Sequence, residues 1–284
     1  GPSPDVLTNR VRIATREPNE TLREIFAYIE AIAAVHPLIA IGIGCFGPVC
    51  LDVTSPHYGT ITATPKLAWR DFPMWSTLAK RFAVPVGFDT DVNAAALGEL
   101  HYGAGRDRNS LLYVTVGTGI GVGAVLAGQP LHGLMHPEAG HVLLPQDTSV
   151  DAFAGVCPYH GNCLEGLASG PAIKERWKVN SALDLPADHP AWDLEAEYLS
   201  QALRNIILCL SPERIILGGG VMRQPGLLTK LIAKTRTTLN GYIQNNACKN
   251  WDSYIVAPAF ADDAGVVGAL ALAKNVIRTV EEYV

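Results

Sequence analysis

Apolar residues recur along this chain with two different spacings, and stretches of the two kinds alternate from one end to the other. Leu22, Ile25, Ile29 and Ile32 recur at the period of an amphipathic helix that packs on a sheet. A capping box at Thr21–Glu24 is expected to begin this helix, because the hydroxyl and the carboxylate can accept free backbone N–H groups.

Short runs rich in valine, isoleucine and leucine predict strands, and longer runs with helical spacing predict helices. Strands are expected at residues 6–15, 38–43, 84–88, 111–116, 214–217 and 254–258. Helices are expected at residues 72–82, 192–210, 227–243 and 264–277, with one more in the alanine-rich stretch after Asp91. A glycine-rich turn after residue 116, followed by a further apolar run, predicts a hairpin. The alternation of strands and helices predicts an α/β fold.

Composition narrows the class of protein. The 284 residues are 48% hydrophobic and 17% charged, as expected for a globular chain of two domains. A formal net charge of −5 gives no electrostatic reason to expect nucleic acid or a membrane as partner. The cysteine usage, the lack of a leader pattern and the lack of an apolar run long enough to span a bilayer predict a soluble, cytoplasmic protein that acts on small molecules.

Two cysteines and two histidines form a candidate metal site. Cys157, His160 and Cys163 follow one another at C-x2-H-x2-C spacing, and His141 lies upstream. Three soft or borderline ligands this close can share one zinc ion with a fourth ligand that folds back. The alternatives are unrelated core residues or a redox pair, but the spacing between the cysteines differs from a C-x-x-C motif. Four protein ligands leave zinc no open position, so this site is expected to be structural.

One glycine motif invites an interpretation that its context excludes. Gly42, Gly44 and Gly47 match the G-x-G-x-x-G fingerprint of dinucleotide-binding sites. Such a site needs a helix to begin at the loop, so that the helix N-terminus meets the pyrophosphate, and here Pro48 follows. A nicotinamide cofactor is therefore not expected.

Two later glycine-rich turns suit the approach of a ligand to bare main chain. Gly117, Thr118 and Gly119 can present backbone N–H groups to a phosphate, although a tight turn without a ligand has the same pattern. Gly219 and Gly220 follow a predicted strand and leave room for a flat ring or a ribose. Both turns are candidate nucleotide contacts.

Asp91 is the candidate general base, because it lies where a predicted strand meets a predicted helix. Ligands of open α/β sheets are met at the ends of strands, and a carboxylate there can take the proton of an attacking hydroxyl. The alternative is an ordinary helix N-cap, a position that aspartate favours. Asn93, two residues further on, can hold a sugar hydroxyl.

Five motifs, DTDVNAAALGE, TVGTGIGVG, HPEAGH, CPYHGNCLEG and LGGGV, occur in this order. Together they resemble the ROK (repressor, open reading frame, kinase) family of sugar kinases. The CPYHGNC variant is most similar to the zinc-containing bacterial fructokinase branch of that family. The likeness covers nearly the whole chain from about Thr8 onward.

The resemblance implies an actin-like ATPase (ribonuclease-H-like) fold with two α/β lobes and the active site in the interlobe cleft. The small lobe would comprise residues 1–110 and be completed by the C-terminal helix at about 264–284. The large lobe would comprise residues 111–263 and would carry the zinc and nucleotide sites. The resemblance further implies ATP with Mg²⁺ as phosphoryl donor, structural Zn²⁺, a hexose as acceptor and a homodimer.

The resemblance also implies roles for individual residues. Asp91 would be the base that deprotonates the 6-hydroxyl of a hexose, most simply D-fructose, which becomes fructose 6-phosphate. Sugar hydroxyls would be held by Asn93, Glu138 and Glu165. The phosphates and adenosine would meet Gly117, Thr118, Gly119, Pro171, Gly219, Gly220 and Val221. The zinc ligands would be His141, Cys157, His160 and Cys163.

Other functions share parts of this pattern. A glucokinase, mannokinase or N-acylhexosamine kinase of the same family would use the same sugar contacts. The family's repressors add an N-terminal helix-turn-helix domain, which this sequence lacks. The sequence also lacks the D-x-G-G-T or E-x-G-G-T phosphate loop with which the family opens, so we expect either an upstream segment outside it or an incomplete first sheet. In the second case, a non-catalytic sugar-binding or regulatory protein is an alternative.

Overall fold

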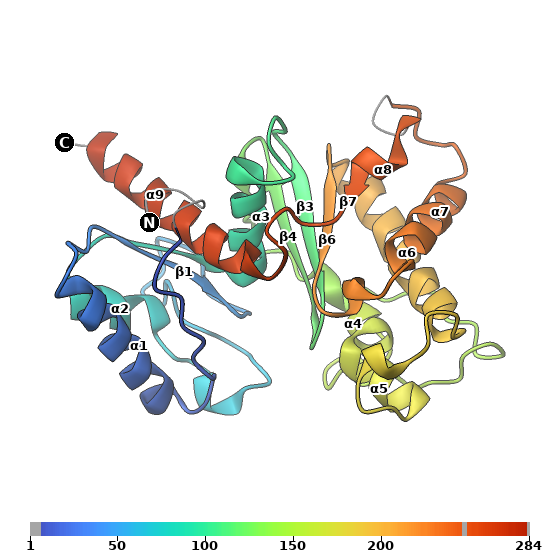
Figure 1. The fold of residues 1–284 in the computed structure, drawn as a ribbon, viewed down its shortest axis with the longest axis horizontal. Helices are drawn as coiled ribbons and strands as arrows, with labels where there is room; N and C mark the ends of the chain where they lie inside the picture. Colours follow the sequence, from blue (N-terminus) through green and yellow to red (C-terminus); the bar gives the residue numbers. More distant parts are fainter. Residues whose placement is uncertain (1–6, 246–248, 283–284) are drawn as a thin grey trace. The chain divides into compact units, whose positions relative to one another are not determined.

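A computed structural model describes residues 7–245 and 249–282 and shows two compact units (Figure 1). Unit 1 consists of residues 1–98, 132–136 and 265–284, and unit 2 of residues 99–131 and 137–264. Each unit is therefore assembled from segments that are separated in the sequence. Among the described residues, no helix combines the length and the apolar character that a membrane crossing requires.

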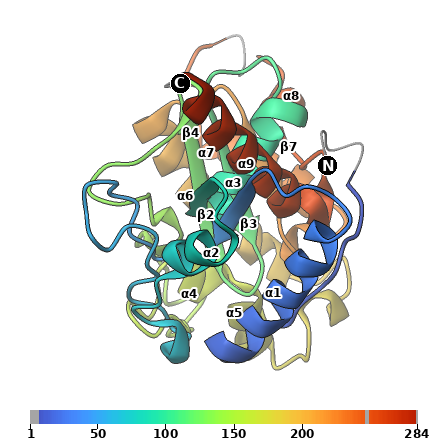
Figure 2. The same ribbon diagram turned by 90° about the vertical axis from the view of Figure 1, so that its left-hand side faces the viewer.

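Unit 1 is a small sheet covered by helices on both faces. Its two strands are parallel, with Ile41 paired to Val86 and Cys45 paired to Thr90. Two helices pack on one face through buried apolar side chains, and the C-terminal helix crosses the other face (Figure 2). The elements are α1 (Pro18–Ala33), β1 (Ile41–Cys45), η2 (Leu67–Trp69), α2 (Met74–Phe82), β2 (Val86–Thr90), the start of α3 (Asp91–Tyr102), and α9 (Ala264–Glu282).

Strand β1 shows why glycines alternate with larger residues in this sheet. Ile41, Ile43 and Cys45 point to the face where α1 and α2 pack. A Cβ on Gly42 would lie 1.7 Å from the backbone oxygen of Ala269 in α9. The G-x-G-x-x-G match therefore includes a packing position, at which only glycine lets a helix approach the sheet this closely.

Unit 2 is built on a five-stranded mixed sheet in the order β5-β4-β3-β6-β7. Strands β3 and β4 form the predicted antiparallel hairpin, and β3 runs parallel to β6. The strands are β3 (Leu111–Val116), β4 (Ile120–Leu126), β5 (Gln129–Pro130), β6 (Ile215–Gly218) and β7 (Ile255–Val256). The helices are η3 (Ala139–His141), α4 (Leu164–Ala168), α5 (Gly170–Trp177), η4 (Ala182–Asp184), α6 (Ala191–Leu210), η5 (Val221–Arg223), α7 (Leu227–Leu239), α8 (Trp251–Tyr254) and η7 (Ala261–Asp263).

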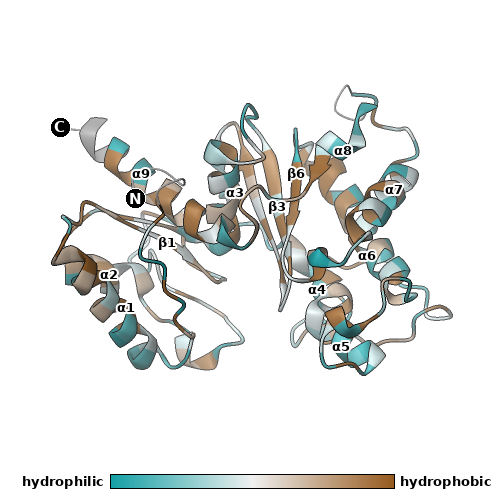
Figure 3. Cartoon of the chain, in the orientation of Figure 1, coloured by the Kyte–Doolittle hydropathy of each residue, from teal (hydrophilic) through white to brown (hydrophobic). Residues whose placement is uncertain are grey.

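The core of unit 2 forms between its sheet and the long helices α6 and α7, which lie side by side (Figure 1). Leu112, Val114, Ile215 and Leu217 are at most 2% exposed, which explains the nearly continuous apolar runs of β3 and β6. Figure 3 shows the same strands among the most hydrophobic parts of the ribbon. This core fixes the strand ends at which the glycine-rich turns emerge.

Two expectations from the N-terminal sequence were wrong. Residues 7–15 form no strand and are mostly exposed, because no neighbouring strand pairs with them among the described residues, and Val6 lies outside those residues. The first helix begins at Pro18, in the first turn where proline is favoured, so Thr21 is inside it rather than at its cap. The Thr21 hydroxyl accepts the backbone N–H of Arg16, and Glu24 forms an ion pair with the same arginine.

The other predicted elements are present with shifted ends. Strand β7 covers only Ile255–Val256, because Tyr254 completes the short helix α8. Helix α7 ends at Leu239, where Asn240 adopts a left-handed conformation that stops the helix. Short capping residues of this kind determine helix ends more sharply than apolar periodicity does.

Candidate active site and metal centre

Asp91 is the first residue of α3 and directly follows β2, as the sequence predicts. Thr90 acts as the cap of this helix, because its hydroxyl oxygen accepts the backbone N–H of Asn93 at 3.1 Å. The Asp91 Oδ1 atom accepts the N–H of Val92 at 2.9 Å, and the residue is exposed to solvent. The carboxylate is therefore accessible to a ligand at the carboxyl end of the strand.

The surroundings of Asp91 disfavour its charged form. Protein atoms crowd the carboxylate and reduce its hydration, and this desolvation raises the pKa of Asp91. The backbone N–H of Val92 and the positive charge of Lys66 act in the opposite direction. A carboxylate with a raised pKa is a better proton acceptor once it is ionised, as a general base must be.

Two residues before Asp91, the side chain of Asp89 is buried and accepts three hydrogen bonds. Its Oδ1 atom accepts the backbone N–H of Thr90 at 2.7 Å and the side-chain amide of Asn93 at 2.8 Å. Its Oδ2 atom accepts from Nε2 of His132 at 2.9 Å, and this hydrogen bond raises the pKa of His132. Asn93 is fully buried, and its contact with a sugar stays a prediction.

A second histidine of the segment 132–136 contacts the loop that follows β1. Nε2 of His136 accepts the backbone N–H of Val49 at 3.1 Å, and this bond is buried. Together with the His132 bond, it fixes the segment to the ends of both strands of unit 1. The sequence pattern does not predict the hydrogen bonds of His132 and His136, because both join residues that are far apart in the chain.

In unit 2, the structure brings the predicted nucleotide contacts together at the carboxyl ends of β3 and β6. The Gly170 N–H donates to the Gly117 carbonyl at 2.7 Å. A Cβ on Gly117 would lie 3.9 Å from the nitrogen of Gly220, and one on Gly170 would lie 3.9 Å from Cγ2 of Val221. The three turns at residues 117–119, 170–171 and 219–221, here called the glycine cluster, therefore form one surface.

Local backbone geometry explains why this surface needs glycine and proline. Gly219 has φ of +95°, and a Cβ there would lie 2.3 Å from the Val116 carbonyl oxygen. Pro171 is in the first turn of α5, which Ser169 caps by accepting the Ala172 N–H at 3.3 Å. An eight-residue helix thus begins beside the hairpin turn, and helix N-termini favour anions.

Glu165 lies against the hairpin turn of the glycine cluster. Its Oε2 atom accepts the Ile120 N–H at 2.9 Å, and a Cβ on Gly119 would lie 2.6 Å from the same oxygen. Glu138 is half-buried directly before η3, whose last residue is the metal-ligand candidate His141. The predicted sugar contacts of both glutamates are not tested by these positions, but each is held next to a metal-ligand candidate.

The four metal-ligand candidates converge in unit 2. The ligand atoms of His141, Cys157, His160 and Cys163 all lie within 4.8 Å of one another. Nδ1 of His141 is 3.6 Å from Sγ of Cys157 and 3.5 Å from Sγ of Cys163, and Nδ1 of His160 is 3.7 Å from Sγ of Cys157. Zn–S bonds of about 2.3 Å and Zn–N bonds of about 2.0 Å in a tetrahedron give S···N separations of about 3.5 Å. The side chains therefore fit zinc.

Tight loop packing brings these ligands together. Gly161, between His160 and Cys163, has φ of +60° and lets the chain fold back, so that Cys157 and Gly161 bridge. Leu143, two residues after His141, bridges to Cys163. These bridges therefore join two segments, residues 141–143 and 157–163, into one site.

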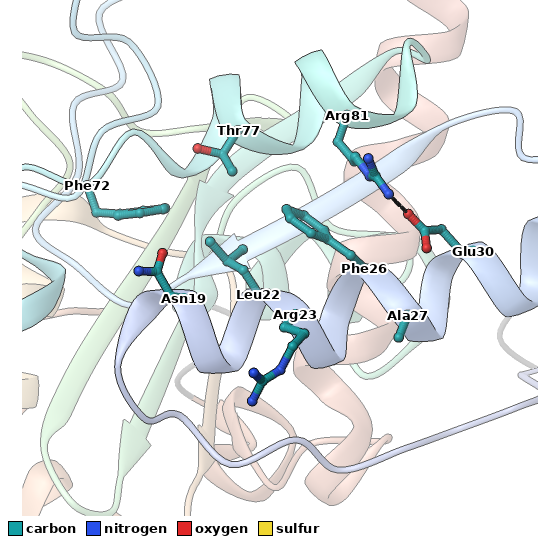
Figure 4. A pocket seen from close by; sticks show the side chains of 9 residues that line it. All are labelled: Asn19, Leu22, Arg23, Phe26, Ala27, Glu30, Phe72, Thr77 and Arg81. Atoms are coloured by element: carbon teal, nitrogen blue, oxygen red, sulfur yellow. Dashed lines mark hydrogen bonds and ion pairs between the residues drawn. The ribbon is translucent and has the colours of Figure 1, made fainter.

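A hollow of about 610 Å³ lies elsewhere in unit 1, between α1 and α2 (Figure 4). Leu22 and Phe26 line it, and the ion pair of Arg81 with Glu30 spans it at one end. None of the predicted site residues is among the described residues that line it.

Comparisons with known proteins agree with this geometry. The model of the ROK family matches residues 5–276. The chain is 44% identical to a protein assigned as a fructokinase in Bacillus subtilis (strain 168), over 96% of this chain and 89% of that protein. It is 40% identical to the fructokinase of Zymomonas mobilis, over 92% of this chain and 87% of the relative. The structure resembles a ROK hexokinase from Thermus thermophilus with a TM-score of 0.73 and 27% identity, covering 95% of this chain and 90% of that one.

Proposed function

Because the chain belongs to the ROK family, we propose that it is an ATP-dependent sugar kinase that phosphorylates the 6-hydroxyl of a hexose, with D-fructose as the preferred substrate. Relatives named as fructokinases, at 37% identity and above, support the choice of sugar. The observation that carries the proposal is the exposed, partly desolvated carboxylate of Asp91 at a strand end.

In the proposed reaction, the Asp91 carboxylate takes the proton of the 6-hydroxyl. The sugar oxygen then forms a bond to the γ-phosphorus of ATP, while the bond from that phosphorus to the bridging oxygen breaks and ADP leaves. Little covalent chemistry is required of the protein, so positioning and charge stabilisation dominate. Mg²⁺ bound with ATP would supply charge neutralisation at the phosphates.

Other residues have supporting roles in this proposal. The glycine cluster, which includes Thr118 and Pro171, supplies bare main chain and the N-terminus of α5 for the phosphates and the adenosine. Asn93, Glu138 and Glu165 are proposed to order the sugar site. For Asn93 the structure supports an indirect role, because its amide holds the Asp89 carboxylate.

We assign structural zinc to His141, Cys157, His160 and Cys163. The assignment is supported by the ligand separations and by a set of four protein ligands that leaves no coordination position for a substrate. Zinc bound there would hold η3 and the start of α4, and with them Glu138 and Glu165, in place.

The proposal is tested by incubating the protein with ATP, Mg²⁺ and each of fructose, glucose, mannose and N-acetylmannosamine, and following ADP release. We expect fructose to give the highest kcat/KM and the product to be identified as fructose 6-phosphate by NMR. If another hexose gave the highest kcat/KM, the preferred substrate would differ from fructose, but the proposed phosphoryl transfer would stand. Absence of ADP release with every hexose would contradict the proposed function.

Two further expectations stay predictions. These are a homodimer, which the family resemblance implies, and a cytoplasmic location, which the cysteine usage and the lack of a leader pattern predict. Sedimentation velocity of the purified protein would test the first, and fractionation of the source cells would test the second.

A further inference from the structure

An ammonium group is held over an aromatic ring directly beyond β1. Nζ of Lys66 lies 3.9 Å from the centroid of the Phe46 ring, a cation–π contact. The same ring forms a T-shaped contact with Trp69, with centroids 5.8 Å apart. Trp69 thus supports the Phe46 ring, and the ring holds the Lys66 ammonium over its face.

This position is next to Asp91. Cys45, the residue before Phe46, pairs in register with Thr90, the residue before Asp91. A Cβ on Gly44 would lie only 3.3 Å from the Cα atom of Asp91. Because the two strands are parallel, Phe46 and Asp91 leave the sheet at the same edge. The positive charge of Lys66 accordingly lowers the pKa of both Asp91 and Cys45, against the larger effect of burial.

The Lys66 ammonium has hydrogen-bond donors to spare. Within the described residues it forms no ion pair and no side-chain hydrogen bond, and the residue is exposed. An ammonium carries three N–H donors, and contact with one ring face does not satisfy them. A hexose offers only hydroxyl, ring and carbonyl oxygens, all of which accept hydrogen bonds from an ammonium.

The arrangement of the proposed site favours sugar over phosphate as the partner. Asp91 and Lys66 belong to unit 1, and Asp91 is the group that must reach the sugar hydroxyl. A cation beside the base is therefore placed to contact the sugar.

We propose that Lys66 is a sugar-binding residue, whose ammonium, held on the Phe46 ring, donates a hydrogen bond to an oxygen of the hexose beside Asp91. The inference rests on the proposed sugar kinase function and adds to it a contact that the sequence motifs do not contain. Phe46 acts as a positioning residue, because it touches the lysine rather than the substrate.

The test compares Lys66→Met, Lys66→Arg and wild type. Methionine keeps most of the length and the packing over Phe46 but has no charge or donor. Loss of a charge-assisted hydrogen bond is expected to raise the KM for fructose about tenfold or more, with the KM for ATP unchanged. Lys66→Arg should recover part of the loss, because it keeps the charge and the cation–π contact.

Lys80→Met is the matched control, since Lys80 is an exposed lysine of α2 in the same unit. It should leave both KM values at the wild-type level. Titration calorimetry with fructose in the absence of ATP measures the same contact without turnover, and thermal melts show whether each variant is folded.

The outcomes separate this inference from the proposed function. An active wild type with an unchanged KM for fructose in folded Lys66→Met would overturn the role of Lys66 alone. A rise confined to the KM for ATP would also overturn it, because the cation would then serve phosphate. If the wild type neither turns over nor binds any hexose, both the function and the inference are wrong.

Discussion

The Asp91 carboxylate combines exposure to solvent with a raised pKa, two properties that usually oppose each other. The residue is exposed at the junction of β2 and α3, while partial desolvation of its carboxylate raises the pKa of Asp91. Asp89, one residue away from the junction, is by contrast fully engaged by Thr90, Asn93 and His132. Of the two aspartates of the D-T-D sequence, Asp89 is therefore held in structural bonds, and Asp91 is the one accessible to act as the proposed base.

The dependence of kcat/KM on pH tests whether Asp91, with its raised pKa, is the base. The base must be ionised, and a raised pKa means that ionisation requires a higher pH than for an ordinary aspartate, whose pKa is about 3.9. We expect kcat/KM to fall as the pH decreases through the raised value, so the acid limb should lie above about pH 4. Circular dichroism at each pH controls for unfolding. An acid limb at or below the ordinary value, with the fold intact, would contradict the assignment.

For single residues, the sequence predicted the place of a residue in a strand or helix better than the side chains and backbone groups that it contacts. The place of Asp91 at a strand–helix junction follows from neighbouring residues alone. The cap at Thr90 and the bond of Asn93 to Asp89 are local, since they join residues three and four positions apart, but the sequence pattern placed the possible cap at Asp91 instead. The contact of Lys66 with Phe46 joins residues twenty positions apart and depends on how the chain folds back, so local pattern carries no information on it.

At the scale of elements, the metal loop is the part of the site that sequence spacing describes most fully. Three of its ligand candidates lie within seven residues, 157–163, so their proximity is nearly guaranteed by chain connectivity. The fourth, His141, reaches them through the bridge of Leu143 to Cys163. The prediction that a capping box at Thr21 begins the first helix was wrong, because the helix begins one turn earlier, at Pro18.

We predict that wild-type protein contains about one zinc per chain and that Cys163→Ser loses it. Loss of a structural metal should lower the melting temperature by roughly 5 °C or more, because metal binding stabilises only the folded loop. Cys209→Ser is the control, since Cys209 is an exposed free cysteine of α6. Elemental analysis and thermal melts measure both effects. Full zinc content in Cys163→Ser would be inconsistent with the assigned site.

At the scale of the whole molecule, both units are completed by distant parts of the chain. Helix α9 closes the sheet of unit 1, and its close approach depends on glycines in both partners, since Gly268 meets α3 at Ala94. The two-unit α/β architecture was predictable from the alternation of elements and the family motifs, and the similarity to the ROK hexokinase confirms the actin-like fold. The extent of each unit depends on contacts between chain ends, which periodicity does not describe.

Two glycine substitutions test the closure by α9. Gly42→Ala should destabilise the protein by about 1–3 kcal/mol, because the added Cβ would overlap the backbone of Ala269. Gly265→Ala, in the first turn of α9 with nothing within 4 Å of the added atom, should be neutral or slightly stabilising. Urea unfolding of the three proteins measures the difference. Equal stability of Gly42→Ala and wild type would refute the close packing.

The central claim, that Asp91 is the base of a hexose kinase, is tested most directly by steady-state turnover of Asp91→Asn with fructose and ATP. Asparagine keeps the size of the side chain but cannot accept the proton. We predict that kcat falls by at least about 100-fold, while zinc content, melting temperature and fructose affinity stay close to those of wild type. A folded Asp91→Asn protein that turns over fructose at the wild-type rate would contradict the account.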